Sequence, residues 1–271
     1  MLENAAITIF LLVGLLLGSF ANVVIWRFPR GESVVSPGSH CPACDAPVRW
    51  FDNIPVLSWV LLRARCRDCG AAIPARYPLV EALSGLLWLS AAIAFGLTPR
   101  ALLAAIFFWV LLILTFIDLD TMRLPNPIVG SLAVLGAVAA AIAQFTAVTA
   151  VPLTYDGDVP LVMAGLGLLL GGGLSGAVAG GYALIRGRSG FGMGDVKLLG
   201  AMGLFIGPYV LLALMAGSLV GAVYGVVSAA RASAGLTHKI PFGPFLALGG
   251  IVTALFGPVI VQGYLSIAAL G

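Results

Sequence analysis

The sequence predicts an all-α polytopic membrane protein of about eight transmembrane helices, with one small cysteine-rich loop domain. Hydrophobic residues make up 61% of the 271 residues and charged residues only 9%, whereas soluble domains carry about 25% charged residues. Apolar stretches recur at lengths near the roughly 20 residues that cross a bilayer. Basic residues gather between particular stretches, which gives the chain a consistent orientation.

The predicted helices follow the apolar stretches. They cover residues 5–26, 79–96, 101–117, 127–147, 159–185, 196–207, 209–229 and 243–268. The sixth is short for a span, and Pro208 separates it from the seventh. Glycines crowd the fifth between Gly165 and Gly181, where we expect small residues to let helices pack closely.

The basic residues orient these helices. With the N-terminus outside, thirteen of the fourteen Lys and Arg residues fall on one side of the membrane, and Arg100 alone falls on the other. Cytoplasmic loops carry such an excess of positive charge, so this side is predicted to be cytoplasmic. The first apolar stretch lacks a basic n-region, and we interpret it as a retained span rather than a cleaved signal.

Three domains are predicted: the first transmembrane helix at 1–26, a cytoplasmic domain at 27–78 and a transmembrane domain at 79–271. The cytoplasmic domain holds every cysteine of the chain, in two CxxC motifs separated by twenty-one residues: Cys41, Cys44, Cys66 and Cys69. Two such motifs predict a tetrahedral Zn²⁺ site, and four thiolates leave no open position, so the site would be structural. Metal-free redox or structural cysteine pairs are the weaker alternative. His40 precedes Cys41, and we expect it to be a solvated histidine rather than a substitute ligand.

Two aspartates lie at the ends of apolar stretches, each within a short motif. Asp118 lies in a Phe-Ile-Asp-Leu-Asp segment, and Asp195 ends the motif Gly-Met-Gly-Asp that begins at Gly192. A carboxylate beside hydrocarbon is costly and is a functional hypothesis by default. By the span map both lie at the cytoplasmic edge, and two carboxyl groups that share one proton are the machinery of aspartic proteolysis.

Simpler roles exist for each acid taken alone. Asp195 would lie in the first turn of a helix, where the dipole favours a carboxylate, and Asp118 could be an interfacial anchor. Asp120 is the rival to Asp118, but helix positions two apart do not share a face. We therefore predict a catalytic pair of Asp118 with Asp195.

These motifs together resemble the bacterial type IV prepilin peptidases, also called leader peptidase/N-methyltransferases, of the GxGD aspartic protease class. The resemblance runs through nearly the whole chain and includes the segments 18–27, 53–59 and 75–81, both CxxC motifs, the Asp118 segment and the Asp195 motif. It implies an inner-membrane endopeptidase that cuts prepilin and pseudopilin leaders after a glycine. It also implies zinc at the four cysteines.

The resemblance further implies methylation of the new N-terminal residue with S-adenosylmethionine, a function tied to the first cytoplasmic loop. Asn22, Arg27 and Glu81 lie in that region, although interfacial anchoring or loop folding explains them equally well. The expected partners are pilin helices and the bilayer, with no nucleic acid. The alternative function is a proton- or cation-coupled transporter with a zinc-binding regulatory loop, because intramembrane aspartates suit transport as well.

Overall fold

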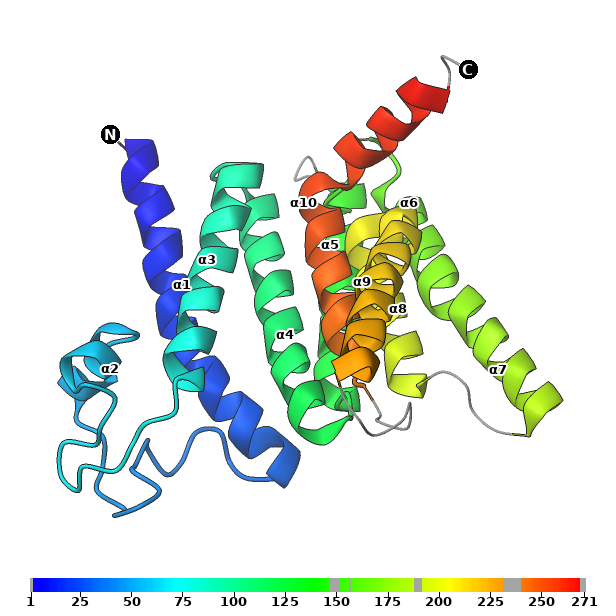
Figure 1. Ribbon diagram of the computed structural model, residues 1–271. Helices are drawn as coiled ribbons and strands as arrows, with labels where there is room; N and C mark the ends of the chain where they lie inside the picture. Colours follow the sequence, from blue (N-terminus) through cyan, green and yellow to red (C-terminus); the bar gives the residue numbers. More distant parts are fainter. Residues whose placement is uncertain (1, 147–151, 156, 188–191, 232–239, 269–271) are drawn as a thin grey trace. The chain divides into compact units, whose positions relative to one another are not determined.

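The structure is a computed structural model that describes residues 2–146, 152–155, 157–187, 192–231 and 240–268 (Figure 1). Arg188 and Lys239, two of the thirteen basic residues assigned to the cytoplasmic side, lie outside this range. So does the last residue of the predicted 127–147 helix.

The described chain is almost entirely helical and holds no β-strand, only two isolated bridges. This confirms the predicted fold class. The long helices are α1 (Leu2–Arg27), α3 (Arg76–Phe95), α4 (Pro99–Thr121), α5 (Asn126–Phe145), α6 (Pro160–Leu168), α7 (Ser175–Arg186), α8 (Met193–Ile206), α9 (Val210–Arg231) and α10 (Gly243–Ala268). The short elements are α2 (Leu57–Leu61), η1 (Phe28–Arg30), η2 (Trp50–Asn53), the π-helical η3 (Leu169–Leu174) and η4 (Gly207–Tyr209).

Seven helical stretches of the described residues are long and apolar enough to cross a membrane. The count is seven rather than eight because the predicted sixth and seventh segments merge, by composition, into one stretch of 39 residues, Met193–Arg231. The backbone nevertheless breaks there, at η4, into α8 and α9. With 14 residues, α8 is only about 21 Å long, too short to cross a bilayer alone.

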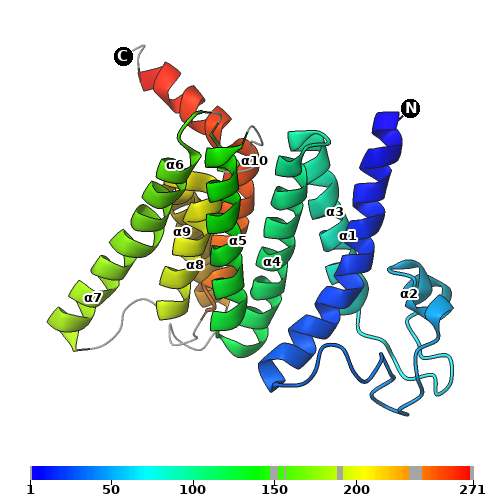
Figure 2. The ribbon, with the colours of Figure 1, turned by 180° about the vertical axis from the view of Figure 1, so that it is seen from behind.

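The chain forms two compact units, residues 1–117 and 118–271. In the first, α1 and α3 run side by side in both views (Figures 1 and 2). Small residues make the contact: a Cβ at Gly14 would lie 2.6 Å from Trp88 Cβ, and one at Gly18 would lie 2.6 Å from Glu81 Cα. Close approach through small residues is how helices associate in lipid.

In the second unit, α8 is the central helix. Every residue from 198 to 206 is buried, and α8 contacts α5, α6, α7, α9 and α10. Its neighbours come close through glycine, as predicted for the Gly165–Gly181 run: a Cβ at Gly167 would lie 2.0 Å from Gly203 O. Burial of residues 198–206 explains why so short a helix is stable in an apolar segment, and the first turn of α8, which carries Asp195, directly precedes this buried part.

Candidate active site and metal centre

Asp118 is held at the end of α4 by a backbone donor. Its side chain is 5% exposed, and the N–H of Gly243, the first residue of α10, donates a 3.0 Å hydrogen bond to Asp118 Oδ2. A Cβ at Gly243 would lie 2.6 Å from that oxygen. Only glycine therefore lets the backbone reach the carboxylate, and a buried acid requires such a partner.

Asp195 is the third residue of α8, in the first turn, as predicted. The Asp195 N–H donates to Gly192 O at 3.0 Å, and a Cβ at Gly192 would lie 2.7 Å from Asp195 Oδ2. The side chain is half-buried. Its carboxylate thus lies over a glycine at the positive end of a helix dipole, where negative charge is favoured.

The structure brings these two acids together. Leu124 lies against the glycine beside each: a Cβ at Gly194 would be 3.2 Å from Leu124 Cβ, and one at Gly243 would be 3.3 Å from Leu124 Cδ2. Asp120 is exposed. The arrangement is a carboxylate pair that could share one proton, and the pairing of Asp118 with Asp195 stays a prediction.

Two parts of this site were missed in the sequence. The Gly243 N–H is one; the available signal was a glycine between Pro241 and Pro244, a pattern that marks an irregular backbone entering a helix. The other is the contact made by Lys197, which was expected to be an interfacial anchor: its Nζ donates to Asn126 Oδ1 at 3.0 Å. This bond joins the N-terminal parts of α8 and α5.

The four cysteines also come together. Their sulfur atoms all lie within 4.8 Å of one another, and Cys41 Sγ is 3.8 Å from Cys69 Sγ. With Zn–S bonds of about 2.3 Å, a tetrahedron places its sulfur atoms about 3.8 Å apart, so this donor set fits Zn²⁺. His40 stays outside the cluster, with Nδ1 3.2 Å from Gly38 O.

The two CxxC motifs fold as matching knuckles. Cys41 N–H donates to Ala46 O at 2.9 Å, and Cys66 N–H donates to Ala71 O at 2.8 Å. Isolated bridges pair His40 with Pro47 and Arg65 with Ala72. Each of these hydrogen bonds and bridges of the first knuckle recurs 25 positions later in the second, from Cys41 to Cys66. The sequence showed no repeat, because the likeness lies mainly in backbone hydrogen bonds.

Backbone N–H groups of the second knuckle favour the thiolate form of one cysteine, which is the form that binds metal. The N–H groups of Cys69 and Asp68 lower the pKa of the Cys66 thiol to about 7. At Cys44 the Ala46 N–H lowers the pKa, but hydrogen bonding to Cys69, burial and Cys41 together raise it to about 12. Four thiols this close cannot all ionise unless a cation balances them, which is what a bound Zn²⁺ would do.

The three residues assigned to the methylation region all contact the backbone of their own unit. Asn22 Nδ2 donates to Tyr77 O at 3.1 Å, and Glu81 Oε2 accepts the Val56 N–H at 2.7 Å. Arg27 is buried and donates to three carbonyls of the loop that follows α1: Ser33 O, Pro37 O and Gly38 O. These contacts favour loop folding as their role.

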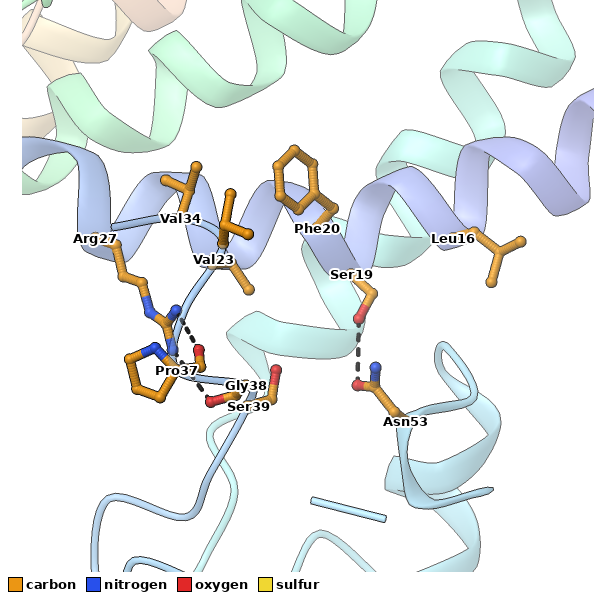
Figure 3. A pocket seen from close by; sticks show the side chains of 11 residues that line it. Leu16, Ser19, Phe20, Val23, Arg27, Val34, Pro37, Gly38, Ser39 and Asn53 are labelled. Atoms are coloured by element: carbon orange, nitrogen blue, oxygen red, sulfur yellow. Dashed lines mark hydrogen bonds between the residues drawn. The ribbon is translucent and has the colours of Figure 1, made fainter. Parts of the chain in front are cut away.

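A pocket of about 270 Å³ opens beside Arg27 (Figure 3). Its apolar wall comes from Phe20 and Val23 of α1, and its polar wall from Ser19 and Asn53, which are joined by a 3.5 Å hydrogen bond. The Arg27 guanidinium faces Pro37 and Gly38 at one end. The pocket therefore lies where the loop closes onto α1.

A buried carboxylate near a second acid, a cluster of four cysteines and seven helical stretches of membrane-spanning length, all among the described residues, define a polytopic membrane protein. Family models cover both units of the chain: the bacterial peptidase A24 N-terminal domain matches residues 12–95, and the type IV leader peptidase family matches residues 105–226. The chain belongs to the type IV leader peptidase family.

Curated relatives match nearly the full length. A prepilin leader peptidase/N-methyltransferase of Aeromonas salmonicida is 37% identical over 94% of this chain and 92% of its own length. A prepilin leader peptidase/N-methyltransferase of Pseudomonas aeruginosa is 34% identical over 95% of this chain and 93% of its own length. A type 4 prepilin-like proteins leader peptide-processing enzyme of Escherichia coli is 38% identical over 89% of this chain and 90% of its own length. No solved structure matches the chain.

Proposed function

We propose that this protein is a membrane aspartic endopeptidase of the bacterial inner membrane that cleaves type IV prepilin or pseudopilin leaders after a glycine. The observation that carries this proposal is the buried Asp118 carboxylate, which accepts the Gly243 N–H, while Leu124 lies against both Gly243 and Gly194, the residue before Asp195. Family membership and the names of the relatives support the same activity.

The proposed mechanism follows from the coupling of the two acids. Two close carboxyls cannot both ionise easily, so the pair holds one proton, which belongs to the pair rather than to one residue. The ionised carboxylate takes a proton from water as the water attacks the scissile carbonyl. The protonated one polarises that carbonyl and later protonates the leaving amine.

The position of the acids suits a substrate that is itself a membrane helix. Asp118 lies in the last turn of α4, and Asp195 lies in the first turn of α8. By the positive-inside bias these helix ends would face the cytoplasm, with the N-terminus outside. A pilin helix in the bilayer would then present its leader junction at the depth of the acids.

N-methylation of the new N-terminus, with S-adenosylmethionine as methyl donor, is the second proposed activity. Its support is the name shared by several relatives. Asn22, Arg27 and Glu81 would serve it indirectly: Arg27 and Glu81 hold the loop to α1 and α3, and Asn22 joins α1 to the start of α3. Zn²⁺ at Cys41, Cys44, Cys66 and Cys69 would act as a structural ion that fixes the loop, since four thiolates saturate it.

Co-expression with a candidate prepilin tests both activities in one measurement. We expect Asp118→Asn and Asp195→Asn to accumulate as folded proteins that leave the prepilin uncut, while Asp120→Asn, the matched exposed control, cleaves it. Mass spectrometry of the pilin reports cleavage and methylation together. Normal cleavage by either of the first two variants would sink the peptidase assignment. The transporter alternative finds no support among the relatives, and it predicts solute uptake into vesicles without proteolysis.

A further inference from the structure

One stretch of the loop exposes large apolar side chains where a soluble loop would bury them. Between residues 50 and 61, which we call the 50–61 segment, η2 and α2 leave Trp50 82%, Leu61 70%, Val60 57% and Leu57 50% exposed. Contiguous exposed apolar residues mark an interaction surface. The proposed function gives this surface no role.

The segment is tied to α1 and α3 well inside their ends. Asn53 accepts a hydrogen bond from Ser19, which precedes the end of α1 at Arg27 by eight residues, or about 12 Å. Val56 donates to Glu81, which follows the start of α3 at Arg76 by five residues, or about 7 Å. In both views α2 is level with the first turns of α3 (Figures 1 and 2).

These ties set the depth of the segment relative to a bilayer. The headgroup layers add roughly 5–8 Å on each side of a hydrocarbon core of about 30 Å. If α1 and α3 cross the membrane, a segment fixed about 7–12 Å inside their ends lies near the boundary between headgroups and acyl chains. Val56 has a φ of 62°, which a β-branched residue rarely adopts, so the contact with Glu81 holds a backbone that would otherwise relax.

Charges beside the segment suit anionic lipid. Arg63 and Arg65 follow α2 and are exposed, while the acids Asp52 and Asp68 form ion pairs with other arginines, Arg67 and Arg49. Exposed arginine next to apolar side chains is the pattern of a segment that lies in a membrane interface and contacts acidic headgroups.

We propose that the 50–61 segment lies in the bilayer, at the boundary of headgroups and acyl chains of the leaflet reached by the ends of α1 and α3. Trp50, Leu57, Val60 and Leu61 enter the acyl region, and Arg63 and Arg65 bind lipid phosphate. Glu81 is a positioning residue that fixes the depth of α2. The loop is thus anchored to lipid as well as to the spans.

Photocrosslinking to lipid tests the proposal on the full chain. The protein carries p-benzoylphenylalanine in place of Leu61, in vesicles of phosphatidylethanolamine and phosphatidylglycerol with alkyne-tagged acyl chains. Leu86, exposed on α3, is the positive control position, and Ala43, exposed in the first knuckle, is the negative one. We expect labelling at Leu61 to equal that at Leu86 and to exceed that at Ala43 about tenfold, as for a side chain in the acyl boundary.

Two results would overturn the proposal. One is labelling at Leu61 as weak as at Ala43 while Leu86 is labelled; the other is a Leu61 crosslink to a protein instead of lipid. A second pair of variants tests the depth: Glu81→Ala removes the acceptor of the Val56 N–H and should lower labelling at Leu61 several-fold, whereas Glu81→Gln keeps an acceptor and should not. Equal labelling in both variants contradicts the role of Glu81. Labelling needs no cleavage, so its failure is separate from failure of the peptidase proposal.

Discussion

Gly243 N–H donates a 3.0 Å hydrogen bond to Asp118 Oδ2 across 125 positions of the sequence. The bond joins the first residue of α10 to the last turn of α4, and it occupies one oxygen of a buried carboxylate. The orientation of Asp118 is therefore set by a backbone N–H. Only glycine fits at position 243, because a Cβ there would lie 2.6 Å from that oxygen.

Gly243→Ala should displace the Asp118 carboxylate. The new methyl group would also meet Leu124 Cδ2 at 3.3 Å, so the carboxylate has to move or rotate. A displacement of about 1 Å at a reacting group costs roughly 100-fold in rate, and we expect a loss of that size in prepilin cleavage. The measurement is the cleavage rate of purified enzyme in detergent.

Gly263→Ala in the same helix is the matched control, since nothing lies within 4 Å of a Cβ there. It should cleave at the wild-type rate. Wild-type cleavage by Gly243→Ala would show that the hydrogen bond does not position the acid.

The central helix of the second unit should tolerate no added methyl group at Gly203. A Cβ there would lie 2.1 Å from Gly167 O, so α6 and α8 must separate, and overpacking of this kind costs about 1–3 kcal/mol. Thermal unfolding followed by circular dichroism should show a lower midpoint for Gly203→Ala. Gly165→Ala, on α6 with open space around its Cβ, should unfold at or above the wild-type temperature. Equal midpoints for the two variants would contradict the close packing of Gly203 against Gly167.

Metal analysis should find one Zn²⁺ per chain. Cys44→Ser removes one of four thiolates and should lower the zinc content close to zero, with faster tryptic cleavage of the arginine-rich 27–78 loop. His40→Ala should keep full zinc content, because His40 lies outside the cluster. Zinc loss in His40→Ala, or full zinc in Cys44→Ser, would require a different ligand set.

Arg27→Lys should loosen the loop after α1 although the charge is kept. A lysine cannot reproduce the planar fork that reaches Ser33 O, Pro37 O and Gly38 O together. Hydrogen exchange followed by mass spectrometry should show faster exchange over residues 33–39. Arg63→Lys, at an exposed position, is the control and should leave that region unchanged. Identical exchange in both variants would mean that other contacts hold the loop.

Much of the fold was predictable because apolar run length dictates where helices lie in a membrane. All eight predicted segments correspond to helical stretches, and Pro208 lies in the predicted break, within η4. The short α2 was not predictable: only three of its five residues, Leu57, Val60 and Leu61, have exposed apolar side chains, too few to show an amphipathic period, and the strained φ of Val56 depends on Glu81, far away in sequence.

Some residues of the candidate site were predictable from the sequence and others were not. Asp118, Asp195 and the four cysteines carry recognisable chemistry at fixed spacing, so the sequence identified them as candidates. Gly243 contributes only a backbone N–H, which any residue but proline possesses, and its importance comes from a contact between distant helices. The structural repeat of the two knuckles was not predicted for a similar reason, because backbone hydrogen bonds depend little on residue identity.

The paired knuckles flank the 50–61 segment, and this placement gives the metal an effect beyond its ligands. An ion bound by Cys44 and Cys66 would close a ring of chain around twenty-one intervening residues. A cross-link that closes a loop of this length removes enough chain entropy to stabilise it by about 3 kcal/mol. Zinc would thereby restrain residues that it does not bind. Val48 and Ala64, at the two ends of the apolar stretch, would be held within a closed loop, and the stretch between them would be ordered before it contacts lipid.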